Sequence, residues 1–372
     1  MRVFIIAGEA SGDLHASNLM KSIRKLGPQT DFMCYGGDLM REAGGTLAKH
    51  YREMNFMGIW EVIKNYGKIR KNLAACKADI RLYRPDALIL VDYAGFNLRI
   101  AEFAKKSGYR VFYYISPKLW AWGKWRVKKV KKYVDRMFVN LPFEVDFYRD
   151  HGITAEYYGN PVVDSVAEGM HRKTDRSSFL HQHGLEDKPI IALLAGSRQQ
   201  EIRLCLPEML SIIKYYPAYQ FIIAGAPSLP PESYQPYTKG SPVRLLHGHT
   251  YEILKHADAA VVTSGTATLE TALHRIPQVV IYKTSAFTYF VGRPFVDIRF
   301  FSLVNLIMDR EVVKEILQDN LARDIRKEMD RILYDQGYRQ EMLDNCDRLI
   351  EKVGKPGVSD RVAQRILALL HP

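Results

Sequence analysis

Acidic side chains follow two apolar runs in the first part of the chain, where they could exchange protons with a ligand. Glu9, Ser11 and Asp13 come directly after residues 3–8, and Asp92 ends the apolar run 87–92. Because the carboxyl ends of parallel strands meet at one edge of a sheet, we expect these side chains to converge. A partly buried carboxylate there is suited to accept a proton, which makes Asp92 a candidate general base. The alternative is that each acid caps the turn or helix after its strand.

A cation and a group of hydroxyl side chains hold the equivalent positions in the second part of the chain. The triplet Gly-Ser-Arg at 196–198 follows one apolar run, and the hydroxyl-rich segment 263–270 follows another. The Arg198 guanidinium can bind two phosphate oxygens at once, and a helix N-terminus attracts anions. Together these features predict a nucleoside diphosphate site, with Glu270 placed to accept from ribose hydroxyls. Taken singly, each could be a surface arginine or a capped helix.

The elements that must position these residues are strands alternating with helices. This alternation predicts an α/β fold with two doubly wound parallel sheets. The break at Gly159-Asn160-Pro161 places a domain boundary near residue 163. From about residue 321 the pattern is helical, and Ser359 is placed to cap a last helix whose apolar face must dock on another surface. The strands are expected at 3–8, 32–36, 87–92, 110–115 and 137–141, then at 190–195, 220–225, 259–263 and 278–282.

The chain is basic, which favours anionic partners. Its formal net charge is +12 and its pI is about 9.3, so nucleic acid, phosphorylated small molecules and an anionic bilayer are all suitable. Two segments could meet such a bilayer. One is the amphipathic stretch 56–73, and the alternative is that its apolar face packs in the protein core. The other is the tryptophan- and lysine-rich stretch 117–132. The residues expected at a membrane or lipid acceptor are Ile59, Trp60, Ile63, Tyr66, Trp120, Trp122, Lys128 and Lys129.

Several classes of protein are disfavoured. The loop at 8–15 lacks G-x-G-x-x-G spacing and carries two acids, which argues against a dinucleotide site, and neither a G-x-S-x-G elbow nor a P-loop occurs. The four cysteines lie far apart, as expected for reduced thiols in the cytosol. No signal peptide or spanning helix is expected. No metal site is expected either, because the pairs His181/His183 and His247/His249 show no carboxylate partner at ligand spacing.

In this order the motifs resemble those of the lipid-A-disaccharide synthase family, inverting glycosyltransferases of the GT-B fold. The resemblance covers nearly the whole chain, and residues 7–16 and Trp120-Ala121-Trp122 are specific to it. Further matches are Asp92 with Phe96-Asn97, Gly159-Asn160-Pro161, Gly196-Ser197-Arg198 with Glu201, and the segments 264–270 and 302–307.

The resemblance implies two Rossmann-like doubly wound domains that face each other across a cleft. It assigns 1–163 to acceptor and membrane binding, 164–345 to UDP-sugar binding, and 346–372 to C-terminal helices that dock on the N-terminal domain of the same or a partner chain. The implied reaction joins UDP-2,3-diacylglucosamine to 2,3-diacylglucosamine 1-phosphate, giving the β-1,6 lipid A disaccharide 1-phosphate and UDP. It needs no cofactor or metal and takes place at the membrane surface, on the cytoplasmic face of the bacterial inner membrane. No nucleic acid is involved, and a homodimer is left open.

The resemblance also implies roles for individual residues. Asp92 would be the general base, with Glu9 and Ser11 orienting the sugars. Glu270 would hold the ribose, and the loop 247–252 would pass beside uracil. The residues expected to bind the nucleotide are Gly196, Ser197, Arg198, Glu201, Tyr251, Ser264, Gly265, Thr266, Thr268, Glu270 and Asn305.

Two other functions fit parts of the sequence. Another GT-B enzyme that uses UDP-N-acetylglucosamine, such as a cell-wall transferase or a UDP-sugar epimerase, would have a similar nucleotide half. A basic membrane- or RNA-binding module explains the charge but leaves the loops at Asp92 and Arg198 unexplained.

Overall fold

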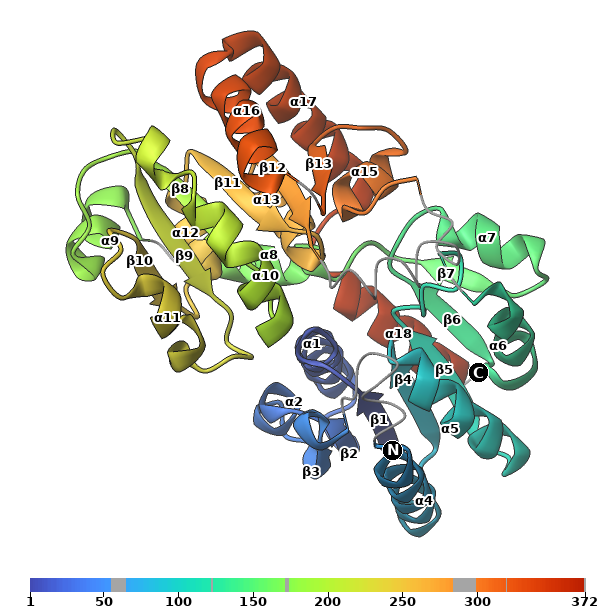
Figure 1. Cartoon of the computed structure of the whole chain (residues 1–372). Coiled ribbons are helices and arrows are strands. Elements are labelled where there is room, and N and C mark those ends of the chain that lie inside the picture. The colour runs from blue at the N-terminus through green and yellow to red at the C-terminus, as the bar shows by residue number, and fades with distance from the viewer. Residues whose placement is uncertain (55–64, 122, 171–173, 284–298, 319, 371–372) are drawn as a thin grey trace. The chain divides into compact units, whose positions relative to one another are not determined.

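The structure is a computed structural model, and it describes residues 1–54, 65–121, 123–170, 174–283, 299–318 and 320–370 (Figure 1). The chain divides into two compact units. The first holds Met1–Pro161 together with Pro356–Pro372, and the second holds Val162–Lys355.

The first unit is built on a seven-stranded sheet whose neighbouring strands all pair in parallel. The strand order is β3-β2-β1-β4-β5-β6-β7. The direction of winding therefore reverses between β1 and β4, and their carboxyl ends form the switch point where open α/β sheets bind ligands. The strands are β1 Arg2–Ala7, β2 Asp31–Gly36, β3 Thr46–His50, β4 Ala87–Val91, β5 Arg110–Tyr114, β6 Arg136–Val139 and β7 Ala155–Tyr157.

Helices cover both faces of this sheet because alternate residues of its central strands point to opposite sides. Val3, Ile5 and Ala7 of β1 face a core lined by α1 and α18, whereas Phe4 and Ile6 face α4, α5 and α6. The helices are α1 Ala10–Leu26, α2 Asp38–Glu42, α4 Tyr66–Tyr83, α5 Ala94–Lys106, α6 Val127–Tyr133, α7 Glu144–Asp150 and α18 Val358–Leu370.

The second unit repeats this plan with a six-stranded parallel sheet in the order β10-β9-β8-β11-β12-β13. Its switch point lies between β8 and β11. The strands are β8 Ile190–Leu194, β9 Gln220–Gly225, β10 Arg244–His247, β11 Ala259–Thr263, β12 Gln278–Tyr282 and β13 Lys314–Leu317. The helices include α8 Val162–Met170, α9 Arg176–His183, α10 Gln199–Leu210, α12 Thr250–His256, α13 Thr266–Leu273, α15 Leu303–Met308, α16 Leu321–Tyr334 and α17 Gln336–Val353.

The α/β class and all nine expected strands are confirmed, and the differences lie at the ends of elements. The division falls after Pro161 instead of after residue 163, and the second unit continues to Lys355, so residues 346–355 belong to it and not to a separate C-terminal segment. Only α18 returns to the first unit. Ser359 is the second residue of α18, which begins at Val358, so it does not cap the helix as expected.

Candidate functional site

The first unit brings the loops after β1 and β4 to the same sheet edge. The two strands are hydrogen-bonded neighbours, and Ala7 lies opposite Val91. The chain therefore leaves the sheet at Gly8 and at Asp92 side by side, at the switch point. Where β1 leads into α1, the hydroxyl of Ser11, the second residue of the helix, donates to a carboxylate oxygen of Glu9 over 2.8 Å. Glu9, Ser11 and Asp92, the expected catalytic residues, thus follow one pair of strands, and all three are half-buried.

The backbone at Asp92 is strained and tightly held. Asp92 and Tyr93 have φ angles of 43° and 48°, in the left-handed region that costs a non-glycine residue about 1–3 kcal/mol. The Asp92 carbonyl accepts from the Asn97 side-chain amide over 2.8 Å and from the Tyr113 hydroxyl. Its N–H donates to the Ile115 carbonyl over 3.1 Å. These bonds fix the direction in which the chain presents the Asp92 side chain.

Tyr93 ties the two loops together, a role that the sequence did not indicate. Its ring lies against Gly8, where an added Cβ would come within 2.2 Å of the ring. The Tyr93 hydroxyl donates to the Met54 carbonyl over 2.6 Å, and the ring stacks on Phe96. Burial raises the pKa of Tyr93 to about 12, so the phenol stays protonated as a donor. Glycine is therefore needed at position 8 because the Tyr93 ring packs against its backbone, which explains this glycine without a bound phosphate.

Asp13 is a structural residue, which removes it from the candidates for a base. Its two carboxylate oxygens accept from the backbone N–H groups of Gly37, Leu39 and Met40 over 2.8–3.1 Å. It thereby caps the N-terminus of α2 from another element. Burial raises the pKa of Asp13, and the three backbone hydrogen bonds oppose that shift.

The loop after β8 presents Arg198 to solvent. Its side chain is 51% exposed, with one guanidinium nitrogen 3.4 Å from a Glu201 oxygen. The other Glu201 oxygen accepts from the backbone N–H groups of Ser197 and Arg198 over 2.9 and 3.2 Å. Gly196 allows this contact, since a Cβ there would lie 2.2 Å from that oxygen. Glu201, expected among the nucleotide-binding residues, thus shapes the loop that carries Arg198.

The loop after β11 lies beside the loop after β8, because Val262 pairs with Leu194 in the sheet. Ser264 donates its hydroxyl to the Phe301 carbonyl over 2.8 Å. The fully buried Thr268 donates to the Gly265 carbonyl and accepts from the Leu303 N–H. Both hydroxyls therefore hold the loop. Among the described residues, a Cβ at Gly265 would meet nothing within 4 Å.

The half-buried Gly265 and Thr266 begin α13, whose N-terminal end carries partial positive charge. Arg198 and this helix end follow neighbouring strands, so a cation and a positive dipole end share one sheet edge. That combination suits a diphosphate.

Tyr251 and Glu270 form a hydrogen-bonded pair beside this edge. The Tyr251 hydroxyl donates to Glu270 over 2.9 Å, and the Tyr251 ring stacks on His274. Burial raises the pKa of the Glu270 carboxyl, and the bond from Tyr251 partly offsets that shift. The pair joins α12 to α13 and leaves the second Glu270 oxygen as an acceptor.

Asn305 is placed differently from expectation. It is fully buried, and its amide nitrogen donates to the Val313 carbonyl and to Glu315 over 2.9 and 2.8 Å. Its oxygen accepts from the N–H groups of Val312 and Val313 over 2.7 and 3.0 Å. With both ends of the carboxamide occupied, Asn305 braces a loop, which contradicts a direct contact with the nucleotide.

The tryptophan-rich stretch is divided between the core and the surface. Trp120 is half-buried and donates its indole N–H to Glu144 over 2.9 Å, so it is held within the first unit instead of lying free for a membrane. Glu144 is fully buried and also accepts from the Ser116 hydroxyl over 2.6 Å. Trp122 lies outside the described residues. Of the tryptophans that the structure describes, Trp125 is exposed, at 66%.

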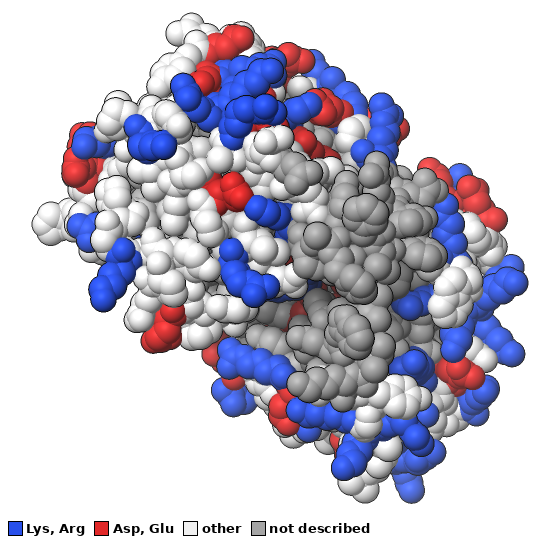
Figure 2. All heavy atoms as spheres, in the orientation of Figure 1, with Lys and Arg blue, Asp and Glu red and all other residues white. Residues whose placement is uncertain are grey.

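Basic side chains gather over α4, α5 and α6, which cover the same face of the first sheet. Figure 2 shows Lys and Arg spheres over this part of the first unit. We call this surface the basic band. Lys128 is exposed, whereas Lys129 is half-buried and lies 3.3 Å from Glu102. The other exposed members are Lys68, Arg70, Lys71, Arg81, Arg84, Arg99, Lys105, Lys106, Lys124, Lys131 and Lys132.

The apolar residues expected at the membrane begin beside this band. Tyr66 is the first residue of α4 and is 56% exposed. Ile59, Trp60 and Ile63 lie outside the described residues. Among the helices of the described residues, none has both the length and the apolar character needed to cross a bilayer.

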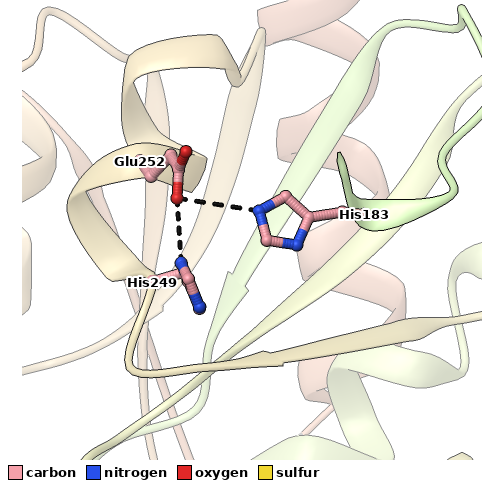
Figure 3. Close-up of side chains that lie close together, drawn as sticks. All are labelled: His183, His249 and Glu252. Carbon is pink, nitrogen blue, oxygen red and sulfur yellow. Dashed lines mark hydrogen bonds and ion pairs between the residues drawn. The ribbon is translucent and has the colours of Figure 1, made fainter. Parts of the chain in front are cut away.

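A group with metal-ligand chemistry was missed by the sequence reasoning. His183, His249 and Glu252 lie together, with their donor atoms within 4.8 Å of one another (Figure 3). The pairing of His249 with Glu252 at i,i+3 on a helix start was the available signal, while the approach of His183 from α9 depends on the fold. The expectation that no carboxylate partners these histidines is therefore wrong.

Two doubly wound sheets, each with charged or polar loops at its switch point, define the GT-B class of nucleotide-sugar enzymes. Similar solved structures include the UDP-GlcNAc 2-epimerase of Neisseria meningitidis bound to UDP-GlcNAc, with a TM-score of 0.68 and 12% identity over 99% of this chain and 100% of that one. Another is the S. aureus MnaA–UDP structure, with a TM-score of 0.67 and 11% identity over 100% and 97% of the two chains. At such identities the likeness shows the fold alone.

Sequence relatives are more specific. The family model described as lipid-A-disaccharide synthetase matches residues 3–364. The lipid-A-disaccharide synthase of Myxococcus xanthus is 39% identical over 379 residues, 100% of this chain and 98% of the relative. That of Geobacter metallireducens is 39% identical over 377 residues, 99% of this chain and 97% of the relative. The chain belongs to the lipid-A-disaccharide synthetase family and is a glycosyltransferase. Family membership favours this function over that of a UDP-sugar epimerase.

Proposed function

We propose that this enzyme transfers 2,3-diacylglucosamine from its UDP conjugate to 2,3-diacylglucosamine 1-phosphate, forming a β-1,6 linkage and releasing UDP. The observation that carries the proposal is membership of the lipid-A-disaccharide synthetase family over residues 3–364. Each unit supports it separately, because the switch point of the first unit offers acids and that of the second offers positive charge.

The second unit is proposed to hold the UDP-sugar. The Arg198 guanidinium and the N-terminal end of α13 would bind the diphosphate and neutralise the charge that develops as the glycosidic bond breaks. Glu270, held by Tyr251, would accept from the ribose hydroxyls. Glu201 would act indirectly, by fixing the loop that carries Arg198.

The first unit is proposed to supply the base. Asp92 would remove the proton from the attacking hydroxyl of the acceptor as that oxygen approaches the anomeric carbon. A single displacement with departure of UDP on the opposite face inverts the configuration. The fixed backbone at Asp92 supports this role, since a base must be held within reach of one particular proton. Glu9 and Ser11, hydrogen-bonded to each other at the start of α1, would orient a sugar.

Acylated substrates place the reaction at a membrane surface. The basic band, with the exposed Trp125 and Tyr66 beside it, is the surface that we propose rests on anionic lipid at the cytoplasmic face of the inner membrane. Attraction to headgroups and burial of aromatic rings would act together.

The test is an incubation of the purified enzyme with both proposed substrates in detergent, followed by mass spectrometry of the products. UDP and the disaccharide 1-phosphate are expected in equal amounts, and omission of either substrate should abolish both. A parallel reaction with UDP-N-acetylglucosamine alone tests the epimerase alternative. Epimerised sugar in that reaction, with no disaccharide in the first, would contradict the proposal.

A further inference from the structure

Two histidines and a glutamate from separate elements of the second unit point toward one another (Figure 3). His183 ends α9, while His249 and Glu252 lie at the start of α12. A single Glu252 oxygen lies 2.8 Å from His249 Nδ1 and 3.7 Å from His183 Nε2. The two imidazole rings meet edge to face, with centroids 4.9 Å apart.

His183 is the residue that this arrangement leaves unsatisfied. Its side chain is 9% exposed. Its Nε2 atom is buried without a hydrogen-bond partner, although it faces the Glu252 carboxylate. A buried ring nitrogen without a partner costs free energy, so the site gains if something binds there. The hydrogen bond between His249 and Glu252 satisfies those two side chains but leaves His183 Nε2 without a hydrogen-bond partner.

We propose that His183, His249 and Glu252 bind a divalent first-row transition metal ion, with Zn²⁺ the best match. Two imidazole nitrogens and one carboxylate oxygen suit Zn²⁺, whereas Ca²⁺ and Mg²⁺ prefer oxygen ligands alone. Donors about 2.0–2.2 Å from a tetrahedral Zn²⁺ lie roughly 3.4 Å apart. Two of the separations are 2.8 and 3.7 Å, and all three donor atoms lie within 4.8 Å of one another, so side-chain rotations would bring them to ligand spacing.

The charge of the group also fits a cation. Glu252 supplies one carboxylate, which accepts from His249 over 2.8 Å, and a neutral imidazole on each histidine supplies a lone pair, as metal ligation requires. Three protein ligands would leave the fourth position to water.

A bound ion would fasten the end of α9 to the start of α12. These helices pack on one core through Phe179 of α9 and Ile253 of α12, so the ion would reinforce an existing contact. Two of the ligands lie on the loop 247–252 that the family resemblance places beside uracil, but the evidence for the site is the geometry of its three side chains, and its test measures Zn²⁺ binding and not the transferase reaction.

The test is metal binding by the full-length, tag-free protein after removal of bound metal. Zn²⁺ is titrated by calorimetry, and Co²⁺ is used as a spectroscopic probe whose strong visible bands report tetrahedral coordination. We expect one tight site in the wild type. His249→Ala and Glu252→Gln should each weaken it by at least about 100-fold, since loss even of an indirect partner of a metal ligand costs 10–100-fold.

His181→Ala is the matched control, because His181 is exposed on the same helix as His183 but lies outside the cluster. It should bind Zn²⁺ like the wild type. Zn²⁺ should raise the unfolding temperature of the wild type and of this control, but not that of the two ligand variants. Glu252→Gln keeps the size of the side chain, so it provides a reading even if His249→Ala fails to fold. Equal Zn²⁺ affinity in all four proteins, or loss of binding in His181→Ala, would overturn the proposal.

Discussion

Single residues at the carboxyl end of β4 combine backbone strain with a reactive group. Asp92 and Tyr93 both adopt left-handed conformations, and such strain persists only where surrounding bonds hold it. Here the buried side chain of Asn97 and the hydroxyl of Tyr113 both bond the Asp92 carbonyl. The carboxylate is thereby presented in a fixed direction at the switch point, which is what the proposed role as a base for one specific proton requires.

Asp92→Asn keeps the shape of the side chain and removes its basicity. We expect turnover to fall by about 10²–10⁴, with UDP affinity unchanged because the nucleotide is assigned to the second unit. Turnover measured at saturating substrate, with calorimetry of UDP, checks both points. Asp150→Asn is the control, since Asp150 is an exposed acid at the end of α7. Near-normal turnover in Asp92→Asn would move the role to Glu9.

Arg198→Ala removes the proposed clamp on the diphosphate. A hydrogen bond to a charged group contributes about 1.5–3 kcal/mol, so UDP should bind roughly 10- to 100-fold more weakly. Arg203→Ala changes an exposed arginine of α10, the helix that Arg198 precedes, and should bind UDP normally. The dissociation constants come from isothermal titration. If Arg198→Ala binds UDP as tightly as the wild type, the diphosphate lies elsewhere.

Sequence reasoning located loops better than it assigned the atoms in them. Asp92 and Arg198 stand out in the sequence because each follows a run of unbroken apolar residues. Asp13 and Asn305 are polar residues that also lie in expected site segments, yet their side chains bond backbone groups of other segments. The same residue type can stabilise a loop or bind a ligand. The sequence does not distinguish these roles, because they depend on which distant residues lie within hydrogen-bond distance in the folded chain.

Some strands are easier to predict from the sequence than others, because a strand that is buried along its length has a continuous apolar run. The strands that were predicted are largely buried along their length, as in β4 and β8. The four that were missed, β3, β7, β10 and β13, are the edges of the two sheets. Edge strands pair on one side only and stay partly exposed, so they lack the apolar run that signals a strand.

Helix α18 joins the end of the chain to the first unit through a buried apolar face. Ile366 is fully buried in the core that α1 shares with α18. Ile366→Ala should lower the free energy of unfolding by about 2–5 kcal/mol, measured by urea denaturation. Gln364→Ala, on the exposed side of the same helix, should change it by no more than about 0.5 kcal/mol. Equal stability of the two variants would mean that α18 docks elsewhere, such as on a partner chain.

Glu144, at the start of α7, should make stability depend on pH. Burial raises the pKa of this carboxyl from 4.5 to about 7, against the lowering effect of its four hydrogen-bond donors. The folded protein then keeps a proton that the unfolded chain releases, so the free energy of unfolding falls as pH rises from 4.5 to about 7. The full effect is about 3 kcal/mol.

Glu144→Gln, which cannot titrate, isolates this contribution. The stability advantage of the wild type over the variant should shrink across that pH window, as followed by urea denaturation at a series of pH values. Asp146→Asn changes an exposed acid of the same helix and should run parallel to the wild type. An advantage that grows with pH would show that the four donors hold the buried carboxyl ionised.

At the scale of the whole molecule, the positions of the positive charges indicate more about function than their total does. The net charge of +12 alone favours any anionic partner. The fold collects lysines and arginines of three helices on one face of the first unit, whereas Arg198 stands at a switch point of the second. A surface of many cations with exposed aromatic rings suits a bilayer, while one arginine beside a helix end suits one diphosphate.

Charge reversal in the basic band should release the enzyme from anionic vesicles. Lys71 on α4 and Lys128 on α6 are both exposed, and each basic residue near such a surface contributes about 1 kcal/mol. Lys71→Glu combined with Lys128→Glu should therefore weaken binding at least about 30-fold, measured by flotation with vesicles that contain phosphatidylglycerol. Raising the salt from 0.1 to 1 M shortens the screening length from about 10 to 3 Å and should weaken wild-type binding likewise.

The control for this prediction has the same net charge and a different distribution. Lys327 of α16 and Lys352 of α17 are exposed in the second unit, and reversing both should leave vesicle binding nearly unchanged. Because the two double variants carry equal total charge, any difference between them reports the place of the charge and not its sum. If both lose binding equally, attraction is a property of the net charge, and the basic band has no special role at the membrane.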